Sequence, residues 1–502
     1  MPDRPAVLMK RTLDKDLDKL NYVEDATRHV ARRLVAPGLG LVFLGLAMLF
    51  AGVYVFDRPS AVLVIAAAAL AAYMAMNIGA NDVTNNVGAA VGARAMTMTQ
   101  ALIIAAIFEI LGATIGGGQV VETISTGLID SVDVANAATI GWIMMAALTA
   151  AALWINLATW LKAPISTTHT IVGAVIGAGI ATAGPASVNW RVILEISASW
   201  MISPLLGALI AAAVLFFIKT FIIYRDDKIT AARYWVPILI AVMAGTFTAY
   251  LALQFSLIFH LAISKTAICL IGLAAGLVAW TVTRPLVTRQ SLGLENKNSA
   301  LRKLFHLPLI GSAALLSFAH GANDVSNAVG PLSAIVRAAD ASIKSVQGAP
   351  PLWVMLIGAF GISVGLLLFG PRLIRLVGEE ITKLNPMRAY CVALSAAFTV
   401  IMASWLGLPV SSTHIAVGAV FGVGFFREWY TRNSKRRIDY MRKKAESWDI
   451  EGPEERDPHE ARRRRLVRRS HFMTIVGAWV ITVPSSALLA AIIYWAMFAL
   501  FV

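Results

Sequence analysis

Long apolar runs, separated by short polar or basic segments, recur along almost the whole chain. Most of them are long enough to span a bilayer as a helix, and some are expected to form hairpins instead. The pattern predicts an all-α polytopic membrane protein with about 12–13 transmembrane elements. Thirteen apolar elements lie near residues 38–56, 60–80, 98–118, 139–160, 165–182, 191–223, 234–256, 260–282, 307–335, 352–370, 389–407, 409–426 and 472–501.

The composition excludes several classes of protein. Hydrophobic residues make up 58% of the 502 positions and charged residues only 14%, whereas a soluble domain carries about 25% charged residues. A water-soluble enzyme and a disordered chain are therefore excluded. The two cysteines, Cys269 and Cys391, both lie inside apolar runs, so we interpret them as small hydrophobic residues rather than as a disulfide framework.

The net charge of +14 follows the rule that cytoplasmic loops of membrane proteins collect Lys and Arg. With the N-terminus in the cytoplasm and the elements alternating in direction, only five of the 43 basic residues fall on the outer side. No nucleic-acid partner is needed to explain the charge. The five outer residues are Arg58, Arg191, Lys265, Arg337 and Lys344.

The ends of the chain and one insertion are polar. Residues 1–37 mix bases with acids and do not resemble a signal peptide, so we expect a cytoplasmic segment followed by a retained transmembrane helix at 38–56. The insertion at 428–471 contains RNSKRR, RKK and RRRR. It is expected to be a solvated cytoplasmic loop that is attracted to anionic lipid headgroups.

An internal repeat organises the rest of the chain. Residues 79–88 read GANDVTNNVG and residues 321–330 read GANDVSNAVG, so that eight of ten positions are identical. A second pair follows in the same order, with PISTTHTIVGAVIG at 164–177 and PVSSTHIAVGAVFG at 409–422. A third, weaker similarity surrounds the Trp200 and Trp479 positions. Such a repeat predicts two related structural halves.

The two halves are expected to cross the membrane in opposite directions. The GANDV motifs fall on the second and ninth apolar elements, which are an odd number of elements apart. Two inverted-topology repeats with broken helices or hairpins at the midplane are a construction of secondary transporters. The predicted division is 60–223 for the first repeat, 224–306 for connecting helices and a cytoplasmic loop, and 307–501 for the second repeat.

The GANDV motifs place an acid inside apolar surroundings. A charged side chain at the bilayer centre costs about 2.5–3.5 kcal/mol on insertion scales. Asp82 and Asp324 would also repel each other if both were ionised, and a bound cation or a shared proton relieves this repulsion. Neutral oxygen atoms, which suit a hard cation such as sodium, come from Asn81, Asn85, Asn323 and Asn327.

The two PxS blocks crowd hydroxyl groups at the start of a helix. Pro164 and Pro409 interrupt the preceding helix, and free N–H groups with a positive dipole end favour a tetrahedral oxyanion. Ordinary N-capping is the plainer interpretation of one such block. The paired, buried setting favours anion binding by Ser166, Thr167, Thr168, Ser411, Ser412 and Thr413.

Three more titratable residues stand out in apolar segments. His169 and His414 follow the hydroxyl blocks and could carry protons, contact an anion or pack between helices. Glu109 is a lone acid in IFEILGATIGG, and an intramembrane acid is a functional candidate by default. Gly361 is its expected counterpart in the second half.

The double motif resembles the inorganic phosphate transporter (PiT) family, over about residues 60–430. The resemblance implies a symporter of inorganic phosphate, driven by sodium or by protons, with an inverted-repeat fold and a homodimeric assembly. Some bacterial members carry sulfate. It also implies that no organic cofactor is required and that the ion, sodium or a proton, is the coupling partner.

The resemblance assigns roles by position. Asp82 and Asp324, with Asn81 and Asn323, match the cation-binding segments, and sodium is the candidate metal at the two aspartates. Glu109 matches a family acid, and His169 and His414 support the site. The serine and threonine residues of the two PxS blocks, together with Asn85 and Asn327, match the phosphate-binding segments. One departure is Ala393, where family members often carry a glutamate.

The sequence therefore predicts a secondary active transporter rather than an enzyme, which imports phosphate by cation symport through alternating access. It is expected in the bilayer of a bacterial inner membrane, with phosphate as the partner, either free or as a metal–phosphate complex. The alternatives are a sulfate permease of the same family, a passive anion channel, and a membrane-embedded hydrolase with a serine or threonine beside His169 as nucleophile.

Overall fold

The structure is a computed structural model, and it describes most of the chain. The first residues of the predicted N-terminal segment and the middle of the predicted insertion lie outside the described residues. The described residues are 12–58, 60–130, 137–161, 165–339, 350–380, 385–446 and 469–501.

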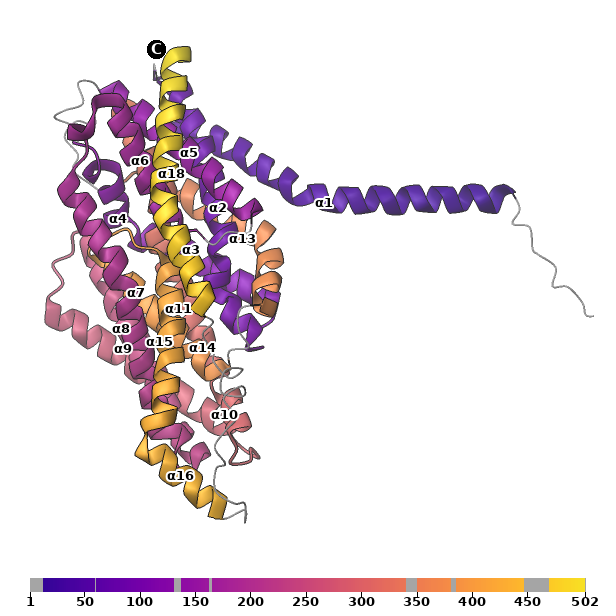
Figure 1. Ribbon diagram of the computed structural model, residues 1–502, viewed down its shortest axis with the longest axis vertical. Helices are drawn as coiled ribbons and strands as arrows, with labels where there is room; N and C mark the ends of the chain where they lie inside the picture. Colours follow the sequence, from indigo (N-terminus) through magenta and orange to yellow (C-terminus); the bar gives the residue numbers. More distant parts are fainter. Residues whose placement is uncertain are drawn as a thin grey trace, which may run out of the picture.

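Helices packed side by side form the whole described part (Figure 1). Its only pairing of extended backbone is an isolated bridge between Ile129 and Val188. The first part of the chain forms α1 (Thr12–Val55), α2 (Ala61–Gly92), α3 (Met98–Gly116), α4 (Gly118–Glu122), a π-helical turn η1 (Thr123–Gly127), α5 (Ala137–Trp160), α6 (Thr167–Ala183), η2 (Pro185–Ser187), α7 (Trp190–Ile218), η3 (Lys219–Ile223), α8 (Lys228–Ile258) and α9 (Lys265–Gln290). The remainder forms α10 (Asn298–Leu304), α11 (His306–Asp324), α12 (Ser326–Ala339), α13 (Leu352–Glu380), α14 (Pro386–Trp405), α15 (Ser412–Asn433), α16 (Lys435–Glu446) and α18 (Arg469–Phe501).

Each of the thirteen predicted apolar elements coincides with helix, so the all-α polytopic class is confirmed. Ten helices in the described part are long and apolar enough to cross a membrane, and α10 with the α11–α12 pair forms an eleventh, bent candidate. Not every predicted element is therefore a full span, in agreement with the expectation that some form hairpins. The physical reason is that α6 has only 17 residues, which is shorter than the approximately 20 residues that a bilayer requires.

The two GANDV motifs differ in backbone structure. The first lies inside the continuous helix α2, which extends twelve residues beyond the predicted end of its apolar run at residue 80. The second lies at a break, because α11 ends at Asp324 and α12 begins at Ser326. Broken helices are thus present in one half at this motif and absent from the other.

Two helical hairpins enter the core from different parts of the chain. The first joins α5 to α6 and the second joins α14 to α15. Their tips meet, because the hydroxyl of Thr168 donates to the carbonyl oxygen of Val410 at 3.0 Å. The indole N–H of Trp200 on α7 donates to the carbonyl of Pro409 at 3.0 Å and so holds the second tip in place.

The two halves pack against each other reciprocally. Helix α2 packs on α13 while α3 packs on α11, and α6 packs on α18 while α7 packs on α15. Glycine permits these close contacts. A Cβ at Gly177 on α6 would overlap the backbone of Ala487 on α18, and a Cβ at Gly422 on α15 would overlap the backbone of Ala208 on α7.

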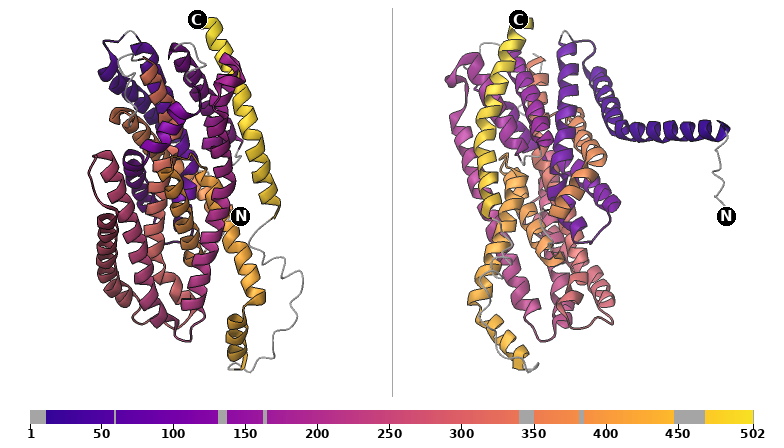
Figure 2. Two further views of the ribbon diagram at one scale, coloured as in Figure 1. Left: turned by 90° about the vertical axis from the view of Figure 1, so that its left-hand side faces the viewer. Right: turned by 45° about the vertical axis from the view of Figure 1, so that its right-hand side comes forward.

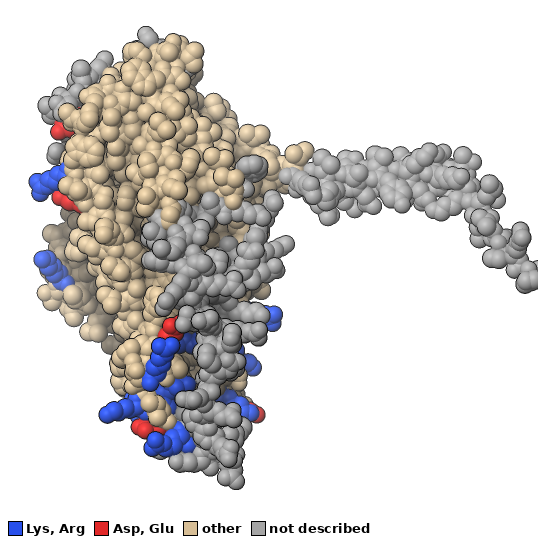
Figure 3. Space-filling view, in the orientation of Figure 1, with Lys and Arg blue, Asp and Glu red and all other residues tan. Residues whose placement is uncertain are grey.

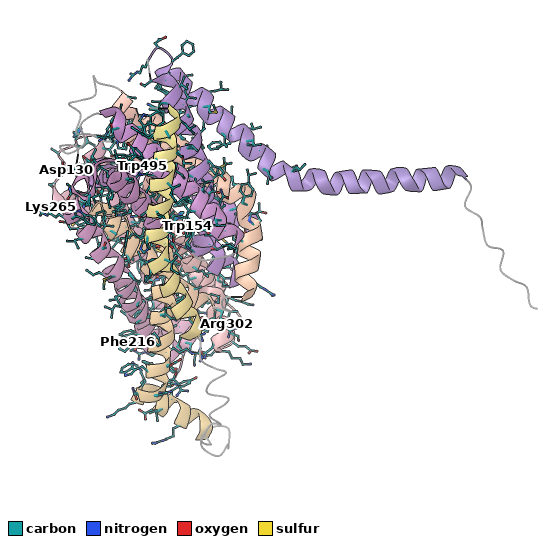
Figure 4. All side chains as sticks on the ribbon, turned by 45° about the horizontal axis from the view of Figure 1, so that its top comes forward. Asp130, Trp154, Phe216, Lys265, Arg302 and Trp495 are labelled. Carbon is teal, nitrogen blue, oxygen red and sulfur yellow. The ribbon has the colours of Figure 1, made fainter. Side chains whose placement is uncertain are left out.

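The two helices that carry the hydroxyl blocks run in opposite directions. Helix α6 leads through η2 to Val188, which is bridged to Ile129, next to Asp130 at the upper end of the molecule (Figure 4). Helix α15 runs to the lower end and continues into α16, while α18 ends at the top (Figures 1 and 2). Opposite directions are what inverted halves require.

Charge is segregated along the long axis. Lys and Arg gather around α16 at the lower end of the face drawn in Figure 3, and the upper part of that face is mostly uncharged. Arg302 lies toward the lower end and Lys265 toward the other (Figure 4). This distribution agrees with the predicted sidedness, in which Arg302 is inside and Lys265 outside.

Substituting valine for Gly177 or for Gly422 is expected to destabilise the protein to a similar extent, because each new side chain would meet backbone of the other half. Overpacking of this kind costs about 1–3 kcal/mol. Gly45→Val on α1 is the matched control, because nothing lies within 4 Å of the position that its Cβ would take. Thermal unfolding in detergent measures the effect, and equal stability of all three variants would contradict the reciprocal packing.

Candidate functional site

The helix starts at the hairpin tips are capped by their own serines. The Ser166 hydroxyl accepts the backbone N–H of His169 at 3.2 Å, and the Ser411 hydroxyl accepts that of His414 at 3.3 Å. The plainer interpretation, N-capping, therefore describes these two serines. Of the hydroxyls that follow them, those of Thr167, Ser412 and Thr413 point toward the acidic residues of the core.

Asp82 lies on α2 and is surrounded by neutral polar groups of both hairpins. Its Oδ1 accepts from the hydroxyl of Thr413 at 3.1 Å, and its Oδ2 accepts from the hydroxyl of Thr167 at 3.4 Å. The amides of Asn81 and Asn85 also donate to this carboxylate, at 3.2 and 3.4 Å. One acid of the first half thus contacts hydroxyls from both halves.

Asp324 has the equivalent place in the second half. Its Oδ2 accepts from the hydroxyl of Ser412 at 2.9 Å and lies 2.9 Å from Nε2 of His320. Asn327, one helical turn further on, donates to the hydroxyls of Thr167 and Thr168 at 3.4 and 3.3 Å. The second motif therefore also reaches the hydroxyl block of the opposite half.

Asn323 fastens the second hairpin. Its amide nitrogen donates to the hydroxyl of Ser404 at 3.0 Å and to the carbonyl of Leu408 at 3.1 Å, and its oxygen accepts the backbone N–H of Val410 at 3.1 Å. These bonds engage both ends of the amide and tie Asn323 to the tip of the second hairpin.

His320 is a site residue that the sequence interpretation missed. Its ring is fully buried, with Nδ1 at 3.1 Å from Oε1 of Glu109 and Nε2 at 3.8 Å from Oδ2 of Asp82. A signal was available, because His320 lies four residues before Asp324 and therefore on the same face of α11. The donor atoms of Asp82, His320 and Asp324 lie within 4.8 Å of one another, a spacing that could hold a cation.

Glu109 belongs to the same buried cluster through neighbours rather than through a direct contact with the aspartates. Its Oε1 accepts from the amide of Asn86 at 2.7 Å as well as facing His320. Asn86 was also missed, although it follows Asn85 directly in the first motif. Three carboxylates and one imidazole thus share an interior without bulk water, and full ionisation would leave them with excess negative charge.

Glu109, His320 and Asn86 form a polar trio, and the positions related to them by the repeat hold apolar residues. A Cβ at Gly321 would overlap the backbone of Glu109, and a Cβ at Gly79 would overlap the backbone of Ile362. Gly321 and Gly79 hold the same position in the two GANDV motifs, so Ile362, which faces Gly79, is the structural counterpart of Glu109. It lies one residue after the expected Gly361. By the alignment of the two motifs, the counterparts of His320 and Asn86 are Ile78 and Ala328, and all three counterparts are fully buried.

His169 and His414 lie on either side of the contact between the hairpins. Their ring centroids are 4.5 Å apart and nearly perpendicular, and His169 also lies 3.8 Å from the ring of Trp200. Both imidazoles are buried. Of the roles that the sequence left open, the contacts favour packing between the helix starts.

An open pocket of about 320 Å³ approaches the second hairpin tip from outside. It is lined by residues of α4, η1 and α7 and by the tip residues Leu406, Gly407 and Leu408. Gly407 has a positive φ of 69°, which glycine adopts without strain. Leu408, which lines the pocket, also accepts the bond from Asn323, so the tip contacts both the pocket and the buried residues.

The chain is similar to known proteins over most of its length. The family model described as "Phosphate transporter family" matches residues 78–490. A relative from Helicobacter pylori, named "Putative phosphate permease", is 41% identical, with 96% of this chain and 98% of the relative covered. The Arabidopsis thaliana protein named "Inorganic phosphate transporter 2-1, chloroplastic" is 33% identical, with 84% of this chain and 70% of the relative covered.

A solved structure shares the fold. It is titled "The sodium-dependent phosphate transporter", has a TM-score of 0.75 and 32% sequence identity, and the match covers 88% of this chain and all of that one. The family and the structural neighbour are transporters rather than enzymes, in agreement with the buried site. With a family model matched over most of its length and these relatives, the chain belongs to the phosphate transporter family.

Proposed function

We propose that this protein imports inorganic phosphate by cation symport. The observation that carries the proposal is the contact between the two carboxylates and the hydroxyls of the hairpin tips, through Thr413 and Thr167 to Asp82 and through Ser412 to Asp324. Hydroxyl donors suit an oxyanion, and carboxylates suit a cation. Placing the two kinds of group in contact lets one ligand stabilise the binding of the other.

The same contact favours phosphate over sulfate. At neutral pH phosphate carries a proton that it can donate to a buried carboxylate, whereas sulfate has none and would face the carboxylate as a bare like charge. The names of the family and the relatives refer to phosphate, and the sulfate alternative has no support from them. A hydrolase or a passive channel has no support either.

Alternating access is supported by the closed state of the site. Asp82 and Asp324 are each only 1% exposed, so a substrate can enter only if a hairpin moves. The second tip is the natural candidate, because the open pocket lies directly against Leu406, Gly407 and Leu408. A hairpin that moves outward carries Ser412 and Thr413 away from the aspartates, which couples opening to the loss of these bonds.

The architecture supports two inverted repeats, at 60–223 and 307–501, joined by connecting helices at 224–306. Its support is the reciprocal packing and the opposite directions of α6 and α15. The basic lower end supports a cytoplasmic placement of the N-terminus and of the 428–471 insertion in an inner membrane. The homodimer and a metal–phosphate form of the substrate rest on the family resemblance.

Sodium is the proposed coupling ion, held by the oxygens of Asp82 and Asp324. The neutral oxygens around Asp82 are ligands that a hard cation prefers, and the structural neighbour is titled as sodium-dependent. A specific observation also favours a proton: His320 lies between Glu109 and Asp324, and an imidazole can carry a proton from one carboxylate to another. The apolar trio at Ile78, Ala328 and Ile362 leaves this second cation site in one half only.

Asp324→Asn is expected to reduce phosphate uptake into proteoliposomes by about ten- to a hundredfold, because hydrogen bonds to a charged group contribute about 1.5–3 kcal/mol. Ser412→Ala, which removes the donor to the same carboxylate, should give a smaller loss in the same direction. Asp439→Asn on the exposed face of α16 is the charge-matched control. Uptake by Asp324→Asn at the level of this control would refute the assignment of Asp324.

Excess sulfate is expected to leave the uptake of labelled phosphate unchanged, because sulfate cannot donate a proton to Asp82 or Asp324. Arsenate, which is protonated like phosphate, should compete. The measurement is initial uptake in proteoliposomes at equal concentrations of either competitor. Competition by sulfate as strong as that by arsenate would show that the carboxylates do not select the anion.

Sodium and pH gradients imposed separately identify the ion. We expect a sodium gradient to drive accumulation of phosphate in the wild type and in His320→Gln, which keeps a polar group but cannot carry a proton at neutral pH. Any accumulation driven by a pH gradient alone should be lost in His320→Gln. Accumulation that follows the pH gradient and ignores sodium would overturn the sodium assignment, while phosphate symport itself would stand.

A further inference from the structure

A group of cations lies at the lower end of the molecule, away from the transport site. Lys219 begins the π-helical turn η3 and is only 7% exposed. Its Nζ lies 4.3 Å from the ring centroid of Tyr430 and 5.4 Å from that of Phe426, both on α15. Figure 4 places Phe216, whose ring contacts both Phe426 and Tyr430, toward this lower end.

Charges of the same sign act on Lys219. Arg427, Arg388 and Arg437 act on its ammonium group by repulsion, and Arg388 is itself repelled by Arg427 and by Arg302 on α10. Within the described part of the chain, no carboxylate forms an ion pair with Lys219 or Arg388. We call Lys219, Arg388, Arg427 and Arg437 the basic cluster.

Tyrosine side chains hold this cluster in a fixed geometry. Tyr224 stacks on Tyr430, with ring centroids 5.8 Å apart and an interplanar angle of 14°, and meets the edge of Tyr440 at 5.6 Å. A second buried lysine, Lys228, places its Nζ 4.9 Å from the ring of Tyr440. Through these contacts the tyrosines link the start of α8 to α15 and α16, next to the cations.

The mutual repulsion of the cations in the basic cluster has to be offset. Like charges gathered in a partly buried place repel one another, and cation–π contacts offset only part of that cost. A phosphate group relieves it, because its oxygens accept from several donors at once and guanidinium groups match it in two-point contacts. The start of α14, capped by Asn385, carries Arg388 in its first turn.

We propose that the basic cluster is a second binding site for a phosphate-bearing anion, separate from the transport site. Two sources share this chemistry: the headgroup of an anionic lipid in the adjacent leaflet, and inorganic phosphate leaving the protein. The site would tie α7, α14 and α15 together at their ends, and α14 and α15 form the hairpin whose tip carries Ser412 and Thr413. The inference does not depend on phosphate being the transported substrate.

The test uses the purified full-length protein in neutral detergent. Native mass spectrometry measures the binding of phosphatidylglycerol, with phosphatidylcholine as the zwitterionic comparison, and thermal unfolding measures stabilisation by inorganic phosphate. The variant Lys219→Gln with Arg388→Gln is compared with Lys265→Gln and Arg289→Gln, which remove two equal charges from exposed positions of α9. We expect the first pair to weaken binding by about tenfold or more and the control pair to leave it nearly unchanged.

The two arms distinguish the sources. Loss of phosphatidylglycerol binding alone assigns the site to a lipid headgroup, and loss of stabilisation by phosphate alone assigns it to the free anion. Lys219→Arg, which keeps the charge and the contact with Tyr430, should bind like the wild type and guards against a variant that fails to fold. If the Lys219 and Arg388 variant binds both probes as the control does, the basic cluster is not an anion site.

Discussion

The structure depends on one constraint, that three carboxylates lie inside a membrane domain where no bulk water can neutralise them. Asp82, Asp324 and Glu109 are held by hydroxyls, amides and a single imidazole. Because these donors come from both hairpins and both halves, the acids keep the tips in contact at the centre of the protein. Any ligand that supplies positive charge changes that balance, which is why a cation can control the position of a hairpin.

The chemistry of the site is less symmetric than its architecture. Glycines bring the backbones of the two halves together in matching pairs, so the surrounding helices repeat closely. The polar trio of Glu109, His320 and Asn86 nevertheless faces an apolar trio at the related positions. Each half contributes one aspartate to the shared centre. The additional titratable cluster is present only once, because the related positions hold apolar residues. Ala393, where the family resemblance predicts a glutamate, is likewise buried.

The charges of the protein serve different purposes at different depths. Acids dominate the buried centre, where they meet hydroxyls, while lysines and arginines dominate the lower end, where aromatic rings support them. This separation allows an anion to be attracted at one surface without being trapped at the centre.

The sequence by itself determined the helical class, the repeat, and the residue types at the centre. Apolar run length, motif spacing and the exclusion of charge from lipid act locally and can be read without coordinates. It could not reveal that α2 continues through its motif, that α6 is too short to span, or that Asn323 is bonded to a hairpin. Only the tertiary structure decided that His320 on α11 meets Asp82 on α2 and Glu109 on α3, because contacts between helices far apart in the chain depend on how the two halves pack.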